Sequence, residues 1–137
     1  MTAFFLDCSI AVTWCFDDEA SDEADALLDH LQEQGAAVPS LFPLELGNIL
    51  ALAERRGRIP ASGLPPRLEL LATLPIQIDP NTAATALRET LTLARRHSLT
   101  TYDASYLELA LRLGLPLAST DRALRQAASD EGVVVLP

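Results

Sequence analysis

The sequence predicts an α/β fold in which a parallel sheet of about five strands is covered by helices on both faces. Short apolar runs alternate with longer segments of helical periodicity, and the runs lack the strict polar–apolar alternation of half-exposed antiparallel strands. With 137 residues and a hydrophobic fraction of 49%, the chain has the size of one domain, and we expect residues 1–137 to form it. Ligands in such open sheets bind beyond the carboxyl ends of the strands.

The N-terminal quarter of the chain predicts two strands and two helices. The first strand is the apolar run Phe4–Leu6, and a helix follows it over about residues 9–16. A second helix begins after Ser21, a favoured N-cap residue, and ends at Gly35, a favoured residue just past a helix. Ala36–Val38 is the second strand.

The middle of the chain predicts three helices and one strand. A helix is expected over residues 43–56, because proline is favoured in the first helical turn. Leucines spaced by three and four residues predict another helix around residues 64–71, and Ile76–Ile78 is the third strand. One continuous helix is expected from near Thr82 to His97.

The C-terminal third predicts two further helices, each followed or preceded by a short strand. A helix over residues 101–113 ends at Gly114, and Leu117–Ala118 forms the fourth strand. A last helix is expected over residues 121–129, and the valine-rich run Val133–Leu136 is the fifth strand.

The charge of the chain argues against a simple nucleic-acid-binding module. The net charge of −9 arises from ten arginines, no lysine and nineteen acids, and nine of the acids lie in the first 33 residues, which contain no basic side chain. Nucleic-acid-binding domains usually carry a basic patch. The two cysteines, Cys8 and Cys15, are too few for a disulfide framework or a zinc site, so we expect both in the core. No signal segment or membrane span is evident, and we expect a cytoplasmic protein without membrane contact.

Four acids are expected near the carboxyl edge of the predicted sheet, namely Asp7, Glu45, Asp103 and Asp121. Asp7 directly follows the first strand, and the others lie in or just before the first turns of helices. Each of them alone is more simply explained as a helix cap or as an acid that complements the helix dipole. Their occurrence at one edge is harder to explain in this way.

Converging carboxylates would be costly unless a cation binds them. Two carboxylates about 4 Å apart repel by about 4 kcal/mol at an effective dielectric constant of 20. This is a large part of a domain stability of about 5–15 kcal/mol. Because the chain has no lysine, a hard divalent ion such as Mg²⁺ or Mn²⁺ is the expected partner. Such an ion binds phosphate oxygens and activates water, so the pattern predicts metal-assisted hydrolysis of phosphodiester bonds.

The sequence resembles the PIN-domain ribonucleases, in order and over nearly its whole length. The segments that resemble the four motifs of that family are residues 4–9, 43–50, 99–110 and 115–124. Within the family it is most similar to the VapC toxins of bacterial toxin–antitoxin pairs. The resemblance implies a PIN-like fold and an endoribonuclease that needs Mg²⁺ or Mn²⁺ and cuts cellular RNA of the tRNA or rRNA class. It also implies a homodimer that a cognate VapB-type antitoxin inhibits.

The resemblance also implies a role for individual residues. The four acids Asp7, Glu45, Asp103 and Asp121 would be the catalytic set. Asp7 and Asp103 would be direct metal ligands, while Asp121 and Glu45 would complete the site through water or a second ion. The polar residues Ser9, Asn48 and Ser119 would orient substrate or water. The family usually has threonine where this chain has Ser119, and the change keeps the hydroxyl.

Several other functions fit the sequence less well. Asp79 at the end of the third strand could pose as a phosphate acceptor, but phospho-acceptor domains and Asp-x-Asp phosphatases require a lysine that is absent here. No glycine-rich dinucleotide fingerprint follows the first strand. The alternatives that stay open are a non-cleaving, metal-binding PIN interaction module and a structure-specific DNA nuclease.

Overall fold

A five-stranded parallel sheet forms the centre of the protein, with the strand order β3-β2-β1-β4-β5. The structure is a computed structural model that describes residues 2–137, so Met1 lies outside the described part of the predicted domain. The strands are β1 (Phe4–Leu6), β2 (Ala36–Val38), β3 (Ile76–Ile78), β4 (Leu117–Ala118) and β5 (Val135–Leu136). All four strand pairs are parallel, which confirms the predicted fold class.

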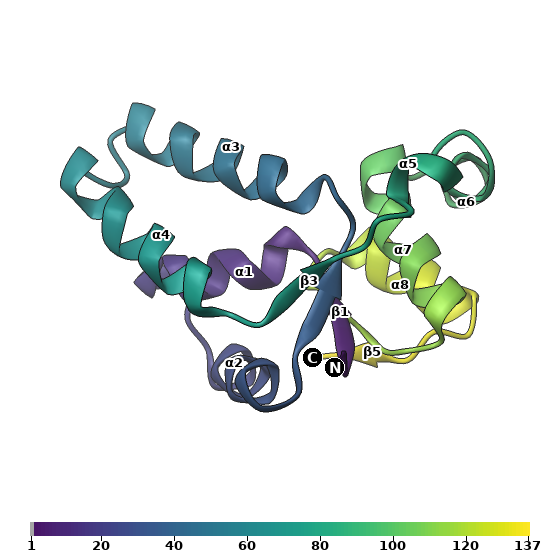
Figure 1. The fold of residues 1–137 in the computed structure, drawn as a ribbon. Helices are drawn as coiled ribbons and strands as arrows, with labels where there is room; N and C mark the ends of the chain where they lie inside the picture. Colours follow the sequence, from purple (N-terminus) through teal and green to yellow (C-terminus); the bar gives the residue numbers. More distant parts are fainter. Residues whose placement is uncertain (1) are drawn as a thin grey trace.

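Helices cover both sides of this sheet. They are α1 (Cys8–Cys15), α2 (Asp22–Gln34), α3 (Phe42–Arg55), α4 (Leu64–Thr73), α5 (Thr82–Thr85), α6 (Glu89–His97), α7 (Thr101–Leu113) and α8 (Arg122–Asp130), with short 3₁₀ helices η1 (Asp17–Glu19) and η2 (Ala61–Gly63). In Figure 1, α1–α4 lie on one side of the strands and α5–α8 on the other. The molecule therefore has three layers.

The central strand β1 is the most deeply buried part of the core. Phe4, Phe5 and Leu6 have no exposed surface. Strands β2 and β4 flank β1 in the sheet, while α1 and α7 contact it. A strand covered on both faces has no polar face, which explains why β1 is a continuous apolar run. Cys8 and Cys15 are buried free thiols, as predicted.

The helix predicted over residues 82–97 is wrong, because α5 ends at Thr85 and α6 begins only at Glu89. Arg88 between them departs from helical geometry, with φ −125° and ψ −107°. The break allows α6 to pack along α7 with Thr90 and Leu93 buried, and the Thr90 hydroxyl donates a hydrogen bond to Thr85 across the break. Tertiary packing has therefore overridden local helical periodicity.

The last strand is shorter than predicted, covering Val135–Leu136 rather than residues 133–136. The backbone N–H of Val133 instead donates to the carbonyl of Ala128 at the end of α8. Gly132 permits this turn with a φ of +81°, a region that favours glycine. The other helix boundaries agree with the prediction to within about two residues. Within residues 2–137, no helix has the length and apolar character to cross a membrane.

Candidate active site

The strand order places a topological switch at β1. The chain passes from β1 to β2 on one side and later returns to β4 on the other side. Asp7 follows β1 directly, Ser119 follows β4 directly, and the Asp7 N–H donates to the carbonyl of Ala118. Ligands of doubly wound sheets bind at this kind of position. The geometry therefore focuses attention on the carboxyl ends of β1 and β4.

Asp7 is a buried carboxylate with hydrogen bonds to both oxygens. Its Oδ1 accepts the Ser9 backbone N–H at 3.1 Å and also the Ser9 hydroxyl, so Asp7 is the N-cap of α1. Its Oδ2 accepts the Ser119 hydroxyl at 2.6 Å. Burial raises the pKa of Asp7, although the two serine hydroxyls oppose the rise and the charge of Asp103 adds to it.

Two serine hydroxyls join the segments after β1 and β4. Ser119 has no exposed surface, and its Oγ accepts the Asp121 N–H at 3.0 Å while donating to Asp7. The Oγ of Ser9 accepts the Thr120 N–H at 2.8 Å. Asp121 is exposed and caps α8 by accepting the Leu124 N–H at 2.9 Å. These bonds hold Asp7, Ser9, Ser119 and Asp121 together in one network.

Asp103 lies in the first turn of α7 and faces the same region. Thr100 caps this helix by accepting the Asp103 N–H at 3.0 Å. Burial raises the pKa of Asp103, and the charge of Asp121 raises it further, while Thr100 opposes this effect. Because the charge of Asp103 in turn raises the pKa of Asp7, the three aspartates interact electrostatically.

Glu45 approaches from the opposite side of the molecule, in the first turn of α3. Its Oε1 accepts a hydrogen bond from the Tyr106 hydroxyl at 2.7 Å. Burial raises the pKa of Glu45, Tyr106 opposes the rise, and the charges of Asp103 and Asp7 add to it. Glu45 therefore interacts with the charges of the aspartates without a direct hydrogen bond to them.

Helix capping explains two of the four acids. Asp7 and Asp121 are N-caps, as the simpler interpretation of the sequence expects. The side chains of Glu45 and Asp103 cap no helix, and both are half-buried with a raised pKa. Asn48, one turn after Glu45, is exposed and makes no side-chain hydrogen bond to the rest of the described chain. The structure thus joins six of the seven predicted residues, by hydrogen bonds or by charge, and leaves Asn48 apart.

The donor chemistry of these residues fits a hard divalent cation. Carboxylate and hydroxyl oxygens are the ligands that Mg²⁺ and Mn²⁺ prefer, and the raised pKa values show that the acids lack a compensating positive charge. In residues 2–137, however, no three Asp, Glu, His or Cys side chains lie close enough together to hold a metal ion. A cation would have to draw Asp7, Asp103 and Asp121 closer together than they lie.

Sequence reasoning missed Tyr106, which is 1% exposed and contacts Glu45. The available signal was its position three residues after Asp103, which puts both on one face of α7. Cys8 was expected only as a core residue, yet its Sγ lies 3.8 Å from the Tyr106 hydroxyl. Burial, with the charge of Glu45 next, raises the pKa of Cys8 to about 12, so this thiol is protonated at neutral pH.

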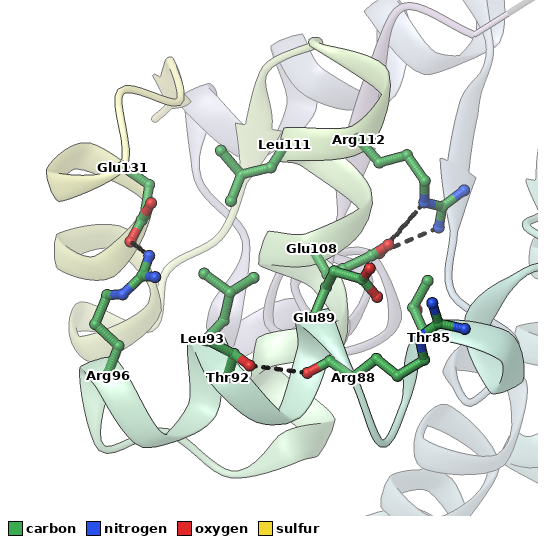
Figure 2. A pocket seen from close by; sticks show the side chains of 10 residues that line it. All are labelled: Thr85, Arg88, Glu89, Thr92, Leu93, Arg96, Glu108, Leu111, Arg112 and Glu131. Atoms are coloured by element: carbon green, nitrogen blue, oxygen red, sulfur yellow. Dashed lines mark hydrogen bonds and ion pairs between the residues drawn. The ribbon is translucent and has the colours of Figure 1, made fainter.

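The most prominent cavity lies elsewhere, between α6 and α7, with a volume of about 730 Å³ (Figure 2). Figure 2 shows Leu93 and Leu111 on its wall, and none of the predicted site residues lines it. Of its arginines, Arg96 pairs with Glu131 and Arg112 with Glu108. Their charges are already compensated, so this cavity is a poor candidate for binding a polyanion.

Residues 4–130 match the sequence family described as the PIN domain. The protein named Ribonuclease VapC3 from Pyrobaculum aerophilum is 29% identical over 109 residues, which are 80% of this chain and 82% of that protein. PAE2754 from the same organism has a TM-score of 0.71 and 27% identity, over 98% of this chain and 83% of that chain. VapBC2 from Rickettsia felis, solved with a promoter DNA fragment, has a TM-score of 0.67 and 13% identity, over 98% and 97% of the chains, and supports the fold alone.

Proposed function

This chain belongs to the PIN-domain family, and from that premise we propose that it is a metal-dependent endoribonuclease of the VapC toxin type. The observation that carries the proposal is the convergence of four acids from α1, α3, α7 and α8, of which Asp7, Glu45 and Asp103 have raised pKa values partly because of one another's charges and that of Asp121. A site of this kind is stabilised by a divalent cation and acquires from it the positive charge that a polyanion needs.

The residues divide the work according to their positions. Asp7, Asp103 and Asp121 would hold the cation, which when bound supplies positive charge to phosphate oxygens and makes water more acidic. The Ser9 and Ser119 hydroxyls fix the Asp7 carboxylate by donating to its two oxygens. Glu45, with its raised pKa, is suited to accept a proton from the attacking water. Asn48, exposed one turn from Glu45, would contact substrate at the rim.

The substrate class and the partners follow from the likeness to VapC proteins. The relative from Pyrobaculum aerophilum is named a ribonuclease, and we assign this chain RNA of the tRNA or rRNA class. The Rickettsia felis structure pairs VapB with VapC, which supports a cognate VapB-type antitoxin here. A homodimer and a cytoplasmic location belong to the same proposal. The acidic N-terminal third would speed association with a basic antitoxin.

Substitution of the acids tests the activity. Asp7→Asn and Asp103→Asn should abolish Mg²⁺-dependent cleavage of total cellular RNA and relieve growth inhibition upon expression, while circular dichroism shows an unchanged fold. Asp29→Asn is the matched control, because Asp29 is exposed on α2 away from the site. Cleavage that persists in both site variants, or in an excess of EDTA, would contradict the proposal.

The same assays separate the two alternatives. Binding of Mn²⁺ without cleavage of any nucleic acid would identify an interaction module. Cleavage of flap-structured DNA in preference to RNA would identify a structure-specific DNA nuclease.

A further inference from the structure

Tyr106 occupies an unusual position among the elements that carry the acids. Its side chain is 1% exposed, and its hydroxyl lies between Glu45 on α3 and Cys8 on α1. Asp7 immediately precedes Cys8, and Asp103 lies one turn before Tyr106 on α7. One hydroxyl therefore contacts or adjoins the elements that bear Asp7, Glu45 and Asp103.

The hydroxyl donates its proton to Glu45. The Tyr106 Oη–Glu45 Oε1 distance of 2.7 Å is that of a hydrogen bond to a charged acceptor. The Cys8 thiol is 3.7 Å from the carbonyl of Phe42, at the start of the helix that carries Glu45, and 3.8 Å from the Tyr106 hydroxyl. Cys8 thus supports the start of α3 and the tyrosine together.

Glu45 depends on this bond more than the other acids depend on any single contact. Asp7 is fixed by Ser9 and Ser119, and Asp121 is fixed by its cap to Leu124. For Glu45 the described residues offer one side-chain hydrogen bond, the one from Tyr106. A flexible glutamate at the edge of a like-charged cluster would otherwise turn towards solvent, away from Asp7 and Asp103.

We propose that Tyr106 is a positioning residue, whose hydroxyl holds the Glu45 carboxylate in the site against the repulsion of the aspartates. The inference rests on the proposed nuclease function. Removal of the hydroxyl leaves the ring in the core and lets Glu45 rotate out, so the defect falls on turnover rather than on substrate binding.

Tyr106→Phe is the direct test, and Tyr102→Phe is the matched control, because Tyr102 is on the same helix and 65% exposed. Tyr106→Phe should lower kcat roughly 10- to 100-fold, as is usual for loss of an outer partner of a site ligand. KM for an RNA oligonucleotide should stay within about twofold, since the lost interaction serves the transition state. Rates are expressed per folded molecule, as measured by circular dichroism.

A stability measurement provides a readout independent of activity. Melting temperatures are compared for Tyr106→Phe, Glu45→Ala and the double variant. If the hydroxyl acts through Glu45, Tyr106→Phe lowers the melting temperature in the wild type and changes it little in the Glu45→Ala background. An equal change in both backgrounds would show that the hydroxyl acts elsewhere and would overturn the inference.

The outcomes distinguish this inference from the proposed function. If Asp7→Asn and Asp103→Asn abolish cleavage while Tyr106→Phe cleaves like the wild type, only the positioning role fails. If the aspartate variants cleave normally, the nuclease proposal fails, and the melting comparison alone decides whether the contact exists. A crystal structure of the wild type with Glu45 turned away from Tyr106 would overturn the inference even if the phenylalanine variant failed to fold.

Discussion

The carboxylate of Asp103 is ionised at a cost to the folded state. Burial and the charge of Asp121 raise its pKa, so the folded protein holds a proton there more tightly than the unfolded chain does. The stabilising effect of that proton is fully present below the unfolded pKa of about 3.9 and is lost as the pH rises through the folded pKa. Asp103 therefore destabilises the metal-free protein at neutral pH relative to acid pH.

Asp103→Asn should consequently raise the melting temperature of the metal-free protein at pH 7, and by less at pH 5, because asparagine cannot ionise. The measurement is thermal unfolding in EDTA between pH 5 and 8. Over this range Glu131 stays ionised, since Arg96 and then His97 lower its pKa. Asp29→Asn removes one charge from the same chain and corrects for the net charge of −9. Equal shifts in the two variants at every pH would contradict the expectation.

At the same scale, the sequence predicted which acids and hydroxyls lie near one another but not how Glu45 is held. Asp7, Ser9, Ser119 and Asp121 follow strand ends, and a parallel sheet brings such positions together once its order is fixed. The partner of Glu45 is 61 residues away on the opposite side of the sheet. Contacts across layers depend on how helices pack, and no local pattern reports them. The catalytic and metal-binding roles of these residues stay predictions.

Individual elements were predictable where the local signal agreed with the packing. All five strands were predicted, because β1 to β4 are short apolar runs between helices. The helix over residues 82–97 was not predicted correctly, since its break serves the packing of α6 on α7. Asp79, which could have posed as a phosphate acceptor, instead forms a bidentate pair with Arg112. That pair depends on the contact between the end of β3 and α7, which the sequence alone does not reveal.

Arg112 links α7 to the end of β3, and its loss should destabilise the fold. Its guanidinium contacts Asp79 and Glu108, whose side chains are each only 6% exposed. Figure 2 shows Arg112 meeting Glu108 beside the cavity. Arg112→Met leaves two nearly buried carboxylates without a cation, which should cost roughly 3 kcal/mol of unfolding free energy. Urea denaturation measures this loss directly.

Arg96→Met is the matched control for that substitution. Arg96 pairs with Glu131 in an ion pair whose arginine side chain is 54% exposed, and exposed pairs contribute little. Its denaturation midpoint should therefore stay close to that of the wild type. A loss of stability in Arg112→Met no greater than in Arg96→Met would show that the Asp79–Arg112–Glu108 cluster is not a stabilising contact.

For the molecule as a whole, the uneven charge decides how a polyanion can approach. The first 33 residues carry nine acids and no basic residue, whereas the remainder has as many arginines as acids. RNA is therefore repelled by the N-terminal third and meets no continuous basic surface. A cation at the carboxyl edge of the sheet would reverse the local field where cleavage is proposed, without changing the overall acidity.

Mg²⁺ should accordingly stabilise the whole fold, because it binds the folded site and not the unfolded chain. Mass action gives about 2.7 kcal/mol at a concentration one hundred times Kd, and for a chain of this size that corresponds to a rise in melting temperature on the order of 10 °C. General screening of a chain with net charge −9 would also raise the melting temperature, so NaCl at equal ionic strength is the reference. Asp7→Asn should lose the Mg²⁺-specific part of the rise and keep the part that NaCl reproduces. If Mg²⁺ and NaCl act alike on the wild type, Asp7 and Asp121 are helix caps alone, and the acidic edge of the sheet binds no ion.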